Sequence, residues 1–272
     1  QRTRFFAFSS GGDNVRHLLI IASNFPPNNV VGTHRILRFT KHLSASGWKI
    51  AVLTICPSDY LPNTRIDEAL LSQIPEGVAV YRTKVLRGMT VLIRLRNDFR
   101  RVFSGRAAST KISNPAPDVQ WGVSSTHHPS VSQRIKDIVT EACSLPDREM
   151  GWLWYAIRQG TKISRRHRIE VIFSSGPPFT NHVVAGLLSG VLKVKWVADF
   201  RDPWSRDPWR SRNRSWMRHV QRWLERRTIQ RADAVILNTQ PMCEEFAEHY
   251  GSAMARKFYT VTNGYDAEIF EP

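Results

Sequence analysis

The chain has 272 residues, of which 42% are hydrophobic, and this is enough for one large globular domain with a buried core. Lys and Arg total 39 against 23 Asp and Glu, so the net charge of +16 predicts a phosphate-rich partner: nucleic acid, anionic lipid or a nucleotide-type substrate. No apolar run approaches the roughly 18 residues of a spanning helix, so we expect a soluble chain or one attached only at a membrane surface.

The cysteines and the chain ends give two further expectations. Cys56, Cys143 and Cys243 are odd in number, lie far apart and lack metal-ligand spacing. They predict neither a disulfide framework nor a zinc site, and they favour a reducing cytosol. Because the chain begins without methionine and stops abruptly at Pro272, we interpret it as a fragment.

Strand and helix patterns alternate through the first part of the chain. Strands are predicted over residues 18–21, 48–55 and 78–82. A breaker-rich loop over 23–32 precedes a helix over 33–43, which Gly47 ends. This alternation is typical of an α/β fold with a doubly wound parallel sheet.

The middle of the chain departs from this pattern. Residues 87–103 form a strongly basic helical stretch, and we interpret the polar residues 104–147 as an irregular excursion from the sheet. A helix is predicted over 148–165. After residue 204, the pattern predicts a basic helix over 214–231, a strand over 234–237, a helix over 241–250 and a strand over 258–261.

Residues 171–204 are the most informative stretch. Two apolar strands, over 171–173 and 195–198, are joined by a helix over 180–192. The first strand opens into the loop SSGPP and the second into the loop DFRDPW. Because loops at the carboxyl ends of parallel strands meet at one edge of the sheet, this unit predicts a small-molecule site at that edge.

The order of these motifs resembles the N-terminal domain of glycosyltransferase family four, which has the GT-B fold. The resemblance covers most of the chain through SSGPPFTNH, ADFRDPW, ADAVILNTQ and VTNGYDAEIF, and its most specific parts are residues 198–204 and 261–270. It implies a Rossmann-like doubly wound parallel sheet over residues 1–262, one half of a GT-B glycosyltransferase. Asn263 and Gly264 would begin a hinge, over 263–272, to a missing C-terminal donor domain.

The resemblance also implies an activity. A retaining transferase would move a hexose-type sugar from a nucleotide-diphosphate sugar to a glycan or lipid-linked acceptor, in polysaccharide biosynthesis. The nucleotide sugar is a co-substrate, and neither a cofactor nor a metal is expected. Such an enzyme would be cytoplasmic or peripheral on the inner face of the cell membrane, and this fragment alone would be inactive. The alternative is a non-catalytic basic module with a Rossmann-like core that binds nucleic acid or a membrane.

Gly32 and Arg35 lie at the predicted start of the first helix. Glycine lets the backbone approach a phosphate, the free N–H groups of a helix start attract an anion, and Arg35 would add a bidentate donor. The family often carries two adjacent glycines in this loop, whereas this chain has one. The structural alternative is a simple turn followed by a solvated arginine.

The loop that follows residue 198 gives the sharper site prediction. By the resemblance, Arg201 falls where many relatives carry a histidine ahead of an aspartate, and Asp202 matches that aspartate, so both are catalytic candidates. A guanidinium stays charged near neutral pH, so Arg201 would bind an oxygen of the acceptor or the diphosphate. Asp202 would orient an acceptor hydroxyl or brace Arg201. The alternative is a self-satisfied ion cluster, and Trp204 would either stack on a sugar or fill the core.

Other residues at the same sheet edge are candidates for binding the donor phosphate or the acceptor: Ser175, Gly176, Asp199, Asn238 and Thr239. Asn and Thr at a helix start also cap it, which is the simpler role for Asn238 and Thr239. His34 and His182 are further candidates, although a lone helical histidine is more often a packing residue. No Ser-His-Asp order, metal-binding histidine pair or Walker-type loop predicts hydrolysis or triphosphate cleavage.

Two basic stretches with interspersed apolar residues are suited to the surface of an anionic membrane. They are residues 87–106, and residues 206–231 with Trp209, Trp216 and Trp223. The first is also consistent with an ordinary helix docked on the sheet, and the second with an RNA-binding face. We favour the membrane over nucleic acid, because members of the resembled family often use lipid-linked acceptors.

Overall fold

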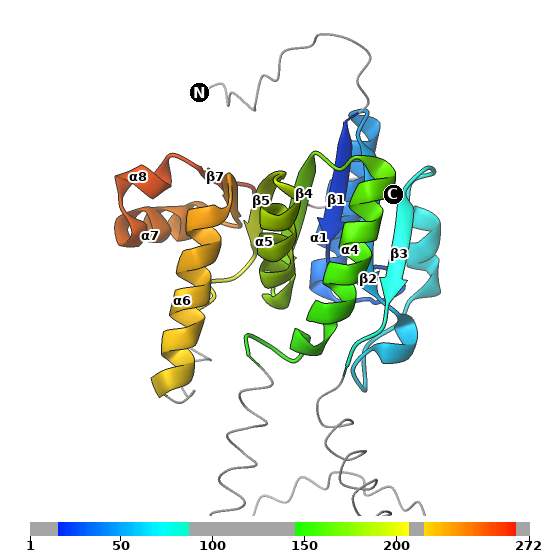
Figure 1. Ribbon diagram of the computed structural model, residues 1–272, viewed down its shortest axis with the longest axis horizontal. Coiled ribbons are helices and arrows are strands. Elements are labelled where there is room, and N and C mark those ends of the chain that lie inside the picture. The colour runs from blue at the N-terminus through cyan, green and yellow to red at the C-terminus, as the bar shows by residue number, and fades with distance from the viewer. Residues whose placement is uncertain (1–15, 87–144, 207–214, 265–272) are drawn as a thin grey trace, which may run out of the picture.

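The computed structural model describes residues 16–86, 145–206 and 215–264 (Figure 1). Its centre is a parallel sheet of seven strands in the order β3-β2-β1-β4-β5-β6-β7. The strands are β1 (His17–Ile21), β2 (Lys49–Ile55), β3 (Ala79–Thr83), β4 (Val171–Gly176), β5 (Lys195–Phe200), β6 (Ala234–Leu237) and β7 (Phe258–Thr260). The direction of strand addition reverses between β1 and β4, and ligands of such sheets bind at the carboxyl ends of the strands beside this switch point.

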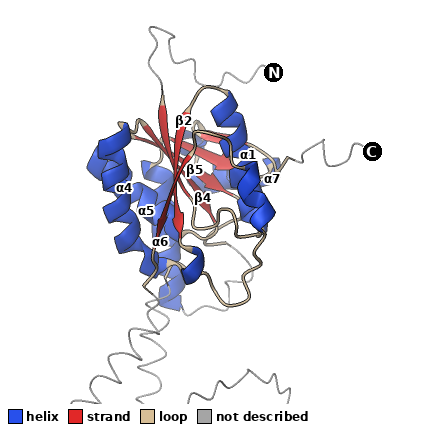
Figure 2. Ribbon diagram, turned by 90° about the vertical axis from the view of Figure 1, so that its right-hand side faces the viewer, coloured by secondary structure: helices blue, strands red, loops and turns tan. Residues whose placement is uncertain are grey.

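Helices cover both faces of the sheet. They are α1 (Val31–Ala45), α4 (Leu153–His167), α5 (Thr180–Leu192), α6 (Ser215–Arg231), α7 (Gln240–Tyr250) and α8 (Ser252–Ala255), with the short 3-10 helices η1 (Pro57–Asp59), η2 (Glu68–Gln73) and η3 (Met150–Trp152). Helices α4, α5 and α6 lie side by side over one face, and α1 lies over the other (Figure 2). Burial from both sides explains why the strands are almost continuously apolar.

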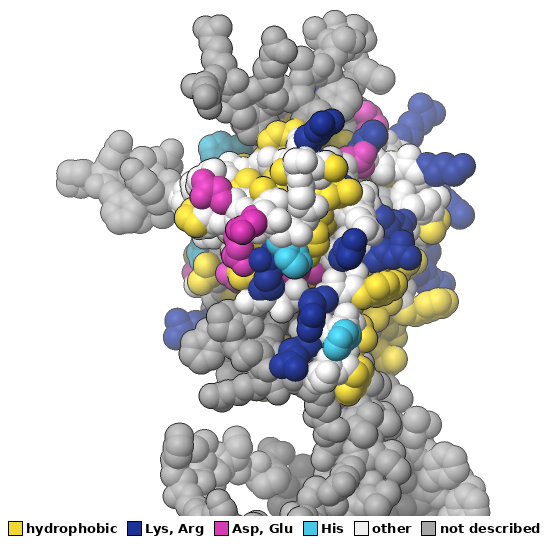
Figure 3. Space-filling model, turned by 90° about the vertical axis from the view of Figure 1, so that its left-hand side faces the viewer, with side chains coloured by type: hydrophobic (Ala, Val, Ile, Leu, Met, Phe, Trp, Pro, Cys, Tyr) yellow, Lys and Arg dark blue, Asp and Glu magenta, His cyan; other side chains and the backbone are white. Residues whose placement is uncertain are grey.

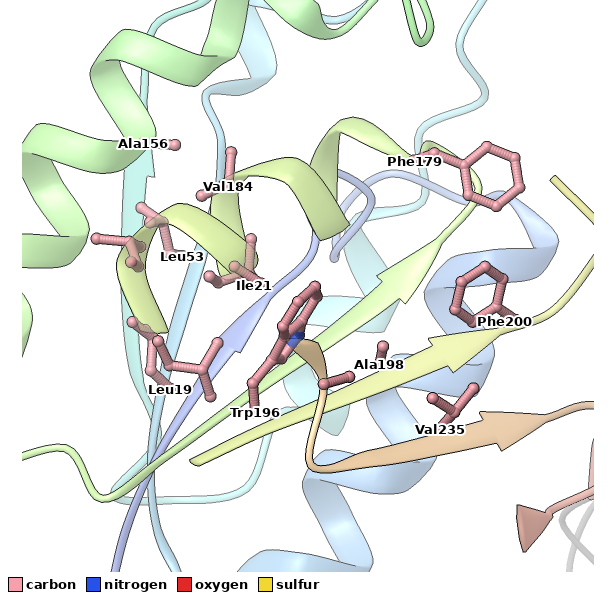
Figure 4. Close-up of a cluster of buried hydrophobic side chains, with 14 of the residues drawn as sticks. Leu19, Ile21, Leu53, Ala156, Phe179, Val184, Trp196, Ala198, Phe200 and Val235 are labelled. Carbon is pink, nitrogen blue, oxygen red and sulfur yellow. The ribbon is translucent and has the colours of Figure 1, made fainter. Parts of the chain in front are cut away.

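Alternate residues of each strand pack against opposite helix layers. In β1, Leu19 and Ile21 belong to the core under α4 and α5, whereas Leu18 and Ile20 belong to the core under α1. Figure 4 shows Trp196 of β5 within the first of these cores, which buries its side chain almost completely. A one-residue slip of a strand would exchange its two faces, so this packing fixes the register and the edge at which the strands end.

The doubly wound parallel sheet predicted from the sequence is confirmed, with one correction. Residues 174–176 and 199–200 were predicted to lie in loops, but they continue β4 and β5, where Ser175 pairs with Asp199 and Gly176 with Phe200. These polar residues stay within the sheet because the Ser175 hydroxyl donates to Asp199 Oδ2 over 2.7 Å. A pair of buried polar groups that satisfy each other is tolerated in a strand.

Several predictions concern residues outside the described ranges: the basic stretch 87–106, most of the excursion 104–147, Cys143, Trp209 and the hinge beyond Gly264. Cys56 and Cys243 are free thiols. None of the helices described is long and apolar enough to cross a membrane.

Candidate functional site

Loops and strand ends at the carboxyl edge of the sheet bring together residues that are far apart in the sequence. Gly32, at the start of α1, lies against the side chain of Arg201, which follows β5. The Arg201 backbone N–H donates to the Gly176 carbonyl at the end of β4 over 2.9 Å. Asp199 and Asn238, at the ends of β5 and β6, both contact the α1 helix. The gathering of these residues along one edge was predicted from the strand pattern.

The absence of a side chain at Gly32 allows Arg201 to lie against α1. A Cβ added at Gly32 would overlap Nη1 of Arg201 and would lie 2.6 Å from its Cζ. Arg201 Nε also donates to the Gly176 carbonyl, over 3.3 Å. The guanidinium is therefore held between the start of α1 and the end of β4. The structure shows that the space beside Gly32 is occupied by the side chain of Arg201. The predicted approach of a phosphate to Gly32 stays a prediction.

Arg201 lies near carboxylates but forms no salt bridge with any of those that the structure describes. Its backbone N–H and its Nε–H both donate to a single uncharged acceptor, the Gly176 carbonyl. Burial lowers the pKa of Arg201, Asp199 and Asp202 act in the opposite direction, and Arg35 adds to the lowering. A desolvated guanidinium with N–H groups to spare favours an incoming anionic oxygen.

The side chain of Arg35 is occupied by internal contacts. Its Nε and Nη2 donate to the two oxygens of Asp199 over 3.0 and 2.7 Å. Its Nη1 donates to Asn238 Oδ1 over 3.3 Å and to Asn263 Oδ1 over 2.9 Å, and Nη2 donates to the Val261 carbonyl over 2.8 Å. A guanidinium has five N–H groups, so these bonds use all of them. In this conformation Arg35 has no N–H group left for the ligand anion that the sequence analysis assigned to it.

The buried partner of Asp199 is therefore Arg35 and not its near neighbour Arg201. Arg35 is 4% exposed and Asp199 is fully buried. The ion cluster considered for the loop after residue 198 does exist, but it joins β5 to α1. The carboxylate of Asp199 is thus satisfied by Arg35, and its predicted ligand contact stays a prediction. Within the described ranges Arg201 has no salt-bridge partner.

Ser175 and Asn181 hold the residues of the sheet edge in place through buried hydrogen bonds. Ser175 donates its hydroxyl to Asp199, and Asn181 Nδ2 donates to the Ser175 carbonyl over 2.7 Å. The Ser23 backbone N–H donates to Asn181 Oδ1 over 3.1 Å, which links the ends of β1 and β4. All three side chains are buried, so the predicted contact of Ser175 with a ligand stays a prediction. The sequence analysis did not identify Asn181 as a site residue. The available signal was a polar residue in the first turn of a mostly apolar helix.

Trp204, Thr239 and Gly176 have packing or capping roles. Trp204 is fully buried and stacks on Phe179 with ring centroids 4.6 Å apart, which assigns it to the core and not to a sugar platform. The Thr239 side chain accepts a backbone N–H in the first turn of α7 over 3.3 Å, the capping role given as the simpler one. A Cβ at Gly176 would lie 2.8 Å from His182 Nε2, so packing requires glycine there.

Solvent reaches Asp202 and His34, as it does the predicted residues Thr239, Asn263 and Gly264. Asp202 is exposed and follows Arg201 directly. His34 is half-buried, and its Nε2 lies 2.8 Å from Asn29 Oδ1. Asp202 is thus open to a ligand at the place where the sequence predicted it.

His182 belongs to a buried polar chain. Trp196 Nε1 donates to the Ser174 hydroxyl over 2.8 Å, and that oxygen lies 2.8 Å from His182 Nδ1. The Ser174 hydroxyl accepts the Trp196 N–H, and it donates to Nδ1 or accepts from it according to the tautomer of the ring. Burial, and secondarily Arg201, lower the pKa of His182 to about 3. The ring is therefore neutral and acts as a packing residue.

The buried neutral ring predicts acid sensitivity. The unfolded chain binds a proton at His182 near its ordinary pKa of 6.5, but the native chain does so only near 3, so acidification between these values favours unfolding. The free energy of unfolding should be about 2 kcal/mol lower at pH 5 than at pH 7 because of this group. Urea unfolding of the chain and of His182→Asn, which keeps an acceptor for Ser174, would measure it. Equal pH dependence of the two proteins would contradict the neutral buried ring.

Two acids that the sequence analysis did not single out hold neighbouring loops. Glu225 of α6 accepts the backbone N–H of Ser205 over 2.6 Å and is also bonded to the Tyr250 hydroxyl. Asp147 accepts the backbone N–H of Thr180 over 2.9 Å at the start of α5. Glu225 is the only acidic residue in the basic sequence of α6. Its isolation among arginines was the signal that could have identified it.

A second concave region lies away from this edge. A cavity of about 520 Å³ runs along the α1 face of β4 to β7 and is lined by apolar side chains such as Phe39, Phe173, Val197 and Ile236. Within the residues that the structure describes, no group of three or more His, Cys, Asp or Glu side chains could hold a metal ion. The expectation of neither metal nor cofactor stays a prediction.

Comparison with known families identifies the class of protein. The model of Glycosyltransferase Family 4 matches residues 122–269, which is more than half of the chain. The chain belongs to glycosyltransferase family 4. The recognition made on ADFRDPW and VTNGYDAEIF is thereby confirmed. A search of curated proteins found no match.

One solved structure supports the same fold. UGT2 of Phytolacca americana, complexed with UDP-2-fluoro-glucose and pterostilbene, is similar with a TM-score of 0.53 and 10% identity, over 94% of this chain and 56% of that chain. HepE of Anabaena, in complex with UDP, has a TM-score of 0.44 and 11% identity, over 94% of this chain and 46% of that chain. This family 4 chain thus spans little more than half of UGT2. The predicted Rossmann-like half of a GT-B glycosyltransferase is confirmed at the level of fold.

Proposed function

We propose that this chain is the acceptor-side, N-terminal half of a retaining glycosyltransferase. The complete enzyme moves a hexose-type sugar from a nucleotide-diphosphate sugar to a glycan or lipid-linked acceptor of polysaccharide biosynthesis. Membership of family 4 supports the transferase class, and the UDP-sugar analogue bound to UGT2 supports a nucleotide-sugar donor. Residues 1–262 form the acceptor-side domain, and a hinge from Asn263 leads to a donor domain without which the chain is inactive.

The unpaired guanidinium of Arg201 is the observation that most directly supports this proposal. It lies at the switch-point edge of the sheet, beside the start of α1, whose free backbone N–H groups also favour an anion. Arginine cannot act as a base near neutral pH, so Arg201 binds a phosphate oxygen and stabilises charge that develops on the leaving diphosphate. Asp202, exposed beside it, orients the acceptor hydroxyl.

The transferase is tested on the protein that contains this chain and its continuation. It is incubated with nucleotide sugars and lipid-linked or glycan acceptors, and the anomeric configuration of the product is read by NMR. We expect sugar transfer with the configuration of the donor retained and no transfer by this chain alone. An inverted product would contradict the retaining mechanism, and donor hydrolysis without transfer to any acceptor would contradict the transferase.

The helix layer of α4, α5 and α6 supports attachment of this cytoplasmic enzyme to an anionic membrane. Large apolar side chains are exposed on it: Trp154 at 73%, Val191 at 70%, Trp223 at 57%, Leu187 at 43% and Trp216 at 38%. The exposed charged side chains of these helices are all basic: Arg158, Lys162, Arg165, Arg166, Arg222, Arg226, Arg227 and Arg231. Figure 3 shows that basic side chains outnumber acidic ones on the side where α6 lies. Exposed tryptophan among arginines is typical of a membrane-surface helix.

Vesicle binding tests this surface. Each arginine near anionic headgroups contributes about 1 kcal/mol, so the double variant Arg226→Gln and Arg227→Gln should bind vesicles containing phosphatidylserine roughly thirtyfold more weakly. The control Arg65→Gln and Lys84→Gln removes the same charge from exposed positions at the other end of the sheet and should bind as the parent does. Equal loss in both variants would contradict a surface on α6. Stronger binding to RNA than to vesicles would support the nucleic-acid alternative instead.

A further inference from the structure

Arg35 joins the first helix to the last described residues of the chain. Its Nη2 donates to the Val261 carbonyl over 2.8 Å and its Nη1 to Asn263 Oδ1 over 2.9 Å. The other contacts of the same guanidinium are with Asp199 and Asn238. One buried side chain of α1 thus contacts residues at the ends of β5, β6 and β7. The main-chain hydrogen bonds described for the sheet do not connect these strand ends to α1.

Among the residues that the structure describes, one main-chain hydrogen bond attaches the segment after β7 to the sheet. Strand β7 has three residues and lies at the edge of the sheet. After it, the Val261 backbone N–H donates to the Leu237 carbonyl over 3.1 Å, and residues 262–264 are exposed. A short edge strand holds its neighbours weakly, so the contacts of Arg35 make up much of what fixes this segment.

Arginine suits this position for a geometric reason. The planar guanidinium directs its N–H groups in fixed directions, so two of them can pair with the Asp199 carboxylate while the others reach separate acceptors. Lysine would preserve the positive charge beside Asp199, but its ammonium group donates from one point. It could not serve Asp199, Val261 and Asn263 together.

We propose that Arg35 is a positioning residue that fixes the departing segment, from Val261 to Asn263, to the carboxyl edge of the sheet. The same guanidinium orients Asp199, which in turn accepts the hydroxyl of Ser175. Arg35 therefore fixes the positions of two features at once. They are the segment where the chain leaves the domain and the polar residues of the sheet edge beside Arg201. If the donor domain of the proposed function follows, Arg35 determines where that domain begins relative to Arg201, a consequence that rests on the proposed function.

Hydrogen exchange on the chain itself tests the proposal without a donor domain or any activity. In Arg35→Lys, exchange of the β7 amides and of the Val261 amide should rise on the order of ten- to a hundredfold, which corresponds to the loss of hydrogen bonds to a charged group. Exchange in β1 and β4 should stay close to that of the parent. Arg158→Lys, at an exposed position of α4, is the matched control and should change neither.

A double-mutant cycle separates the specific link from general loosening. Asn263→Ala should also raise exchange at Val261, but it should add little in the Arg35→Lys background, because both changes break the same contact. Unchanged exchange at Val261 in Arg35→Lys would overturn the proposal. So would an increase spread evenly over all strands, or full additivity of the two substitutions. None of these outcomes depends on whether the complete protein transfers sugar.

Discussion

Replacement of Arg201 by alanine is expected to reduce the turnover of the complete enzyme roughly ten- to a hundredfold, which corresponds to the loss of about 1.5–3 kcal/mol of a charge-assisted hydrogen bond in the transition state. The free energy of unfolding should change little, because Arg201 forms no salt bridge among the described residues and its side chain makes one long hydrogen bond, to the Gly176 carbonyl. The melting temperature of Arg201→Ala should therefore stay close to that of the parent.

Gly32→Ala provides a matched control for this prediction. Its Cβ would overlap the guanidinium, whose flexible side chain can swing away without disturbing the backbone. Alanine is also the better helix former, so stability should be kept while Arg201 is displaced. Turnover should fall as in Arg201→Ala, and the double variant should be no worse than Arg201→Ala alone. Unchanged turnover together with a much lower melting temperature would show that Arg201 is structural.

Arg35→Ala is expected to be the most destabilising single substitution at the sheet edge. Removing one partner of a buried ion pair leaves the other charge without compensation and costs about 3–5 kcal/mol. Asp199 would keep only the hydroxyl of Ser175 as a donor in a fully buried position. Urea unfolding of the chain measures the change in the free energy of unfolding.

Adding Asp199→Asn to Arg35→Ala removes the uncompensated charge. The double variant should therefore be more stable than Arg35→Ala, although less stable than the parent, because Asn238, Val261 and Asn263 still lack their donor. A loss below about 1 kcal/mol in Arg35→Ala would mean that the ion pair contributes little. Equal instability of the single and double variants would mean that the buried charge is not the cause.

The fold could be predicted from sequence because its determinants are local. Apolar runs such as residues 18–21 and 195–198 can bury two faces only within a parallel sheet, and the helical pattern between strands fixes the alternation. The edge on which site residues gather follows from the same pattern, since parallel strands end together. For that reason the contact between Gly32 and Arg201 was within reach of sequence reasoning.

The pairing of charges within the site could not be predicted in this way. Asp199 is two residues from Arg201 in the sequence, yet its partner is Arg35, which is 164 residues away. Which guanidinium reaches which carboxylate depends on where α1 packs on the sheet, and no periodicity encodes that. The ligand contact predicted for Arg35 stays a prediction, although the internal bonds of its guanidinium could not be foreseen for this reason.

Aromatic residues pose a related problem. Tryptophan after a strand can stack on a ligand or pack in the core, and only the position of Phe179 shows that Trp204 packs in the core.

Asn181 was missed because polar residues in a helix are usually solvated. Its burial between Ser23 and Ser175 depends on the loop after β1 meeting the end of β4 in space.

Titration of the isotope-labelled chain with UDP, followed by NMR, tests the central claim that Arg201 and the start of α1 bind an anionic ligand at the sheet edge. We predict saturable shifts of the Gly32 and Thr33 amides and of Arg201 Nε–H, the same shifts with inorganic pyrophosphate, and their loss in Arg201→Ala. Shifts confined to the exposed arginines of α6, or shifts at Gly32 that persist in Arg201→Ala, would contradict the claim.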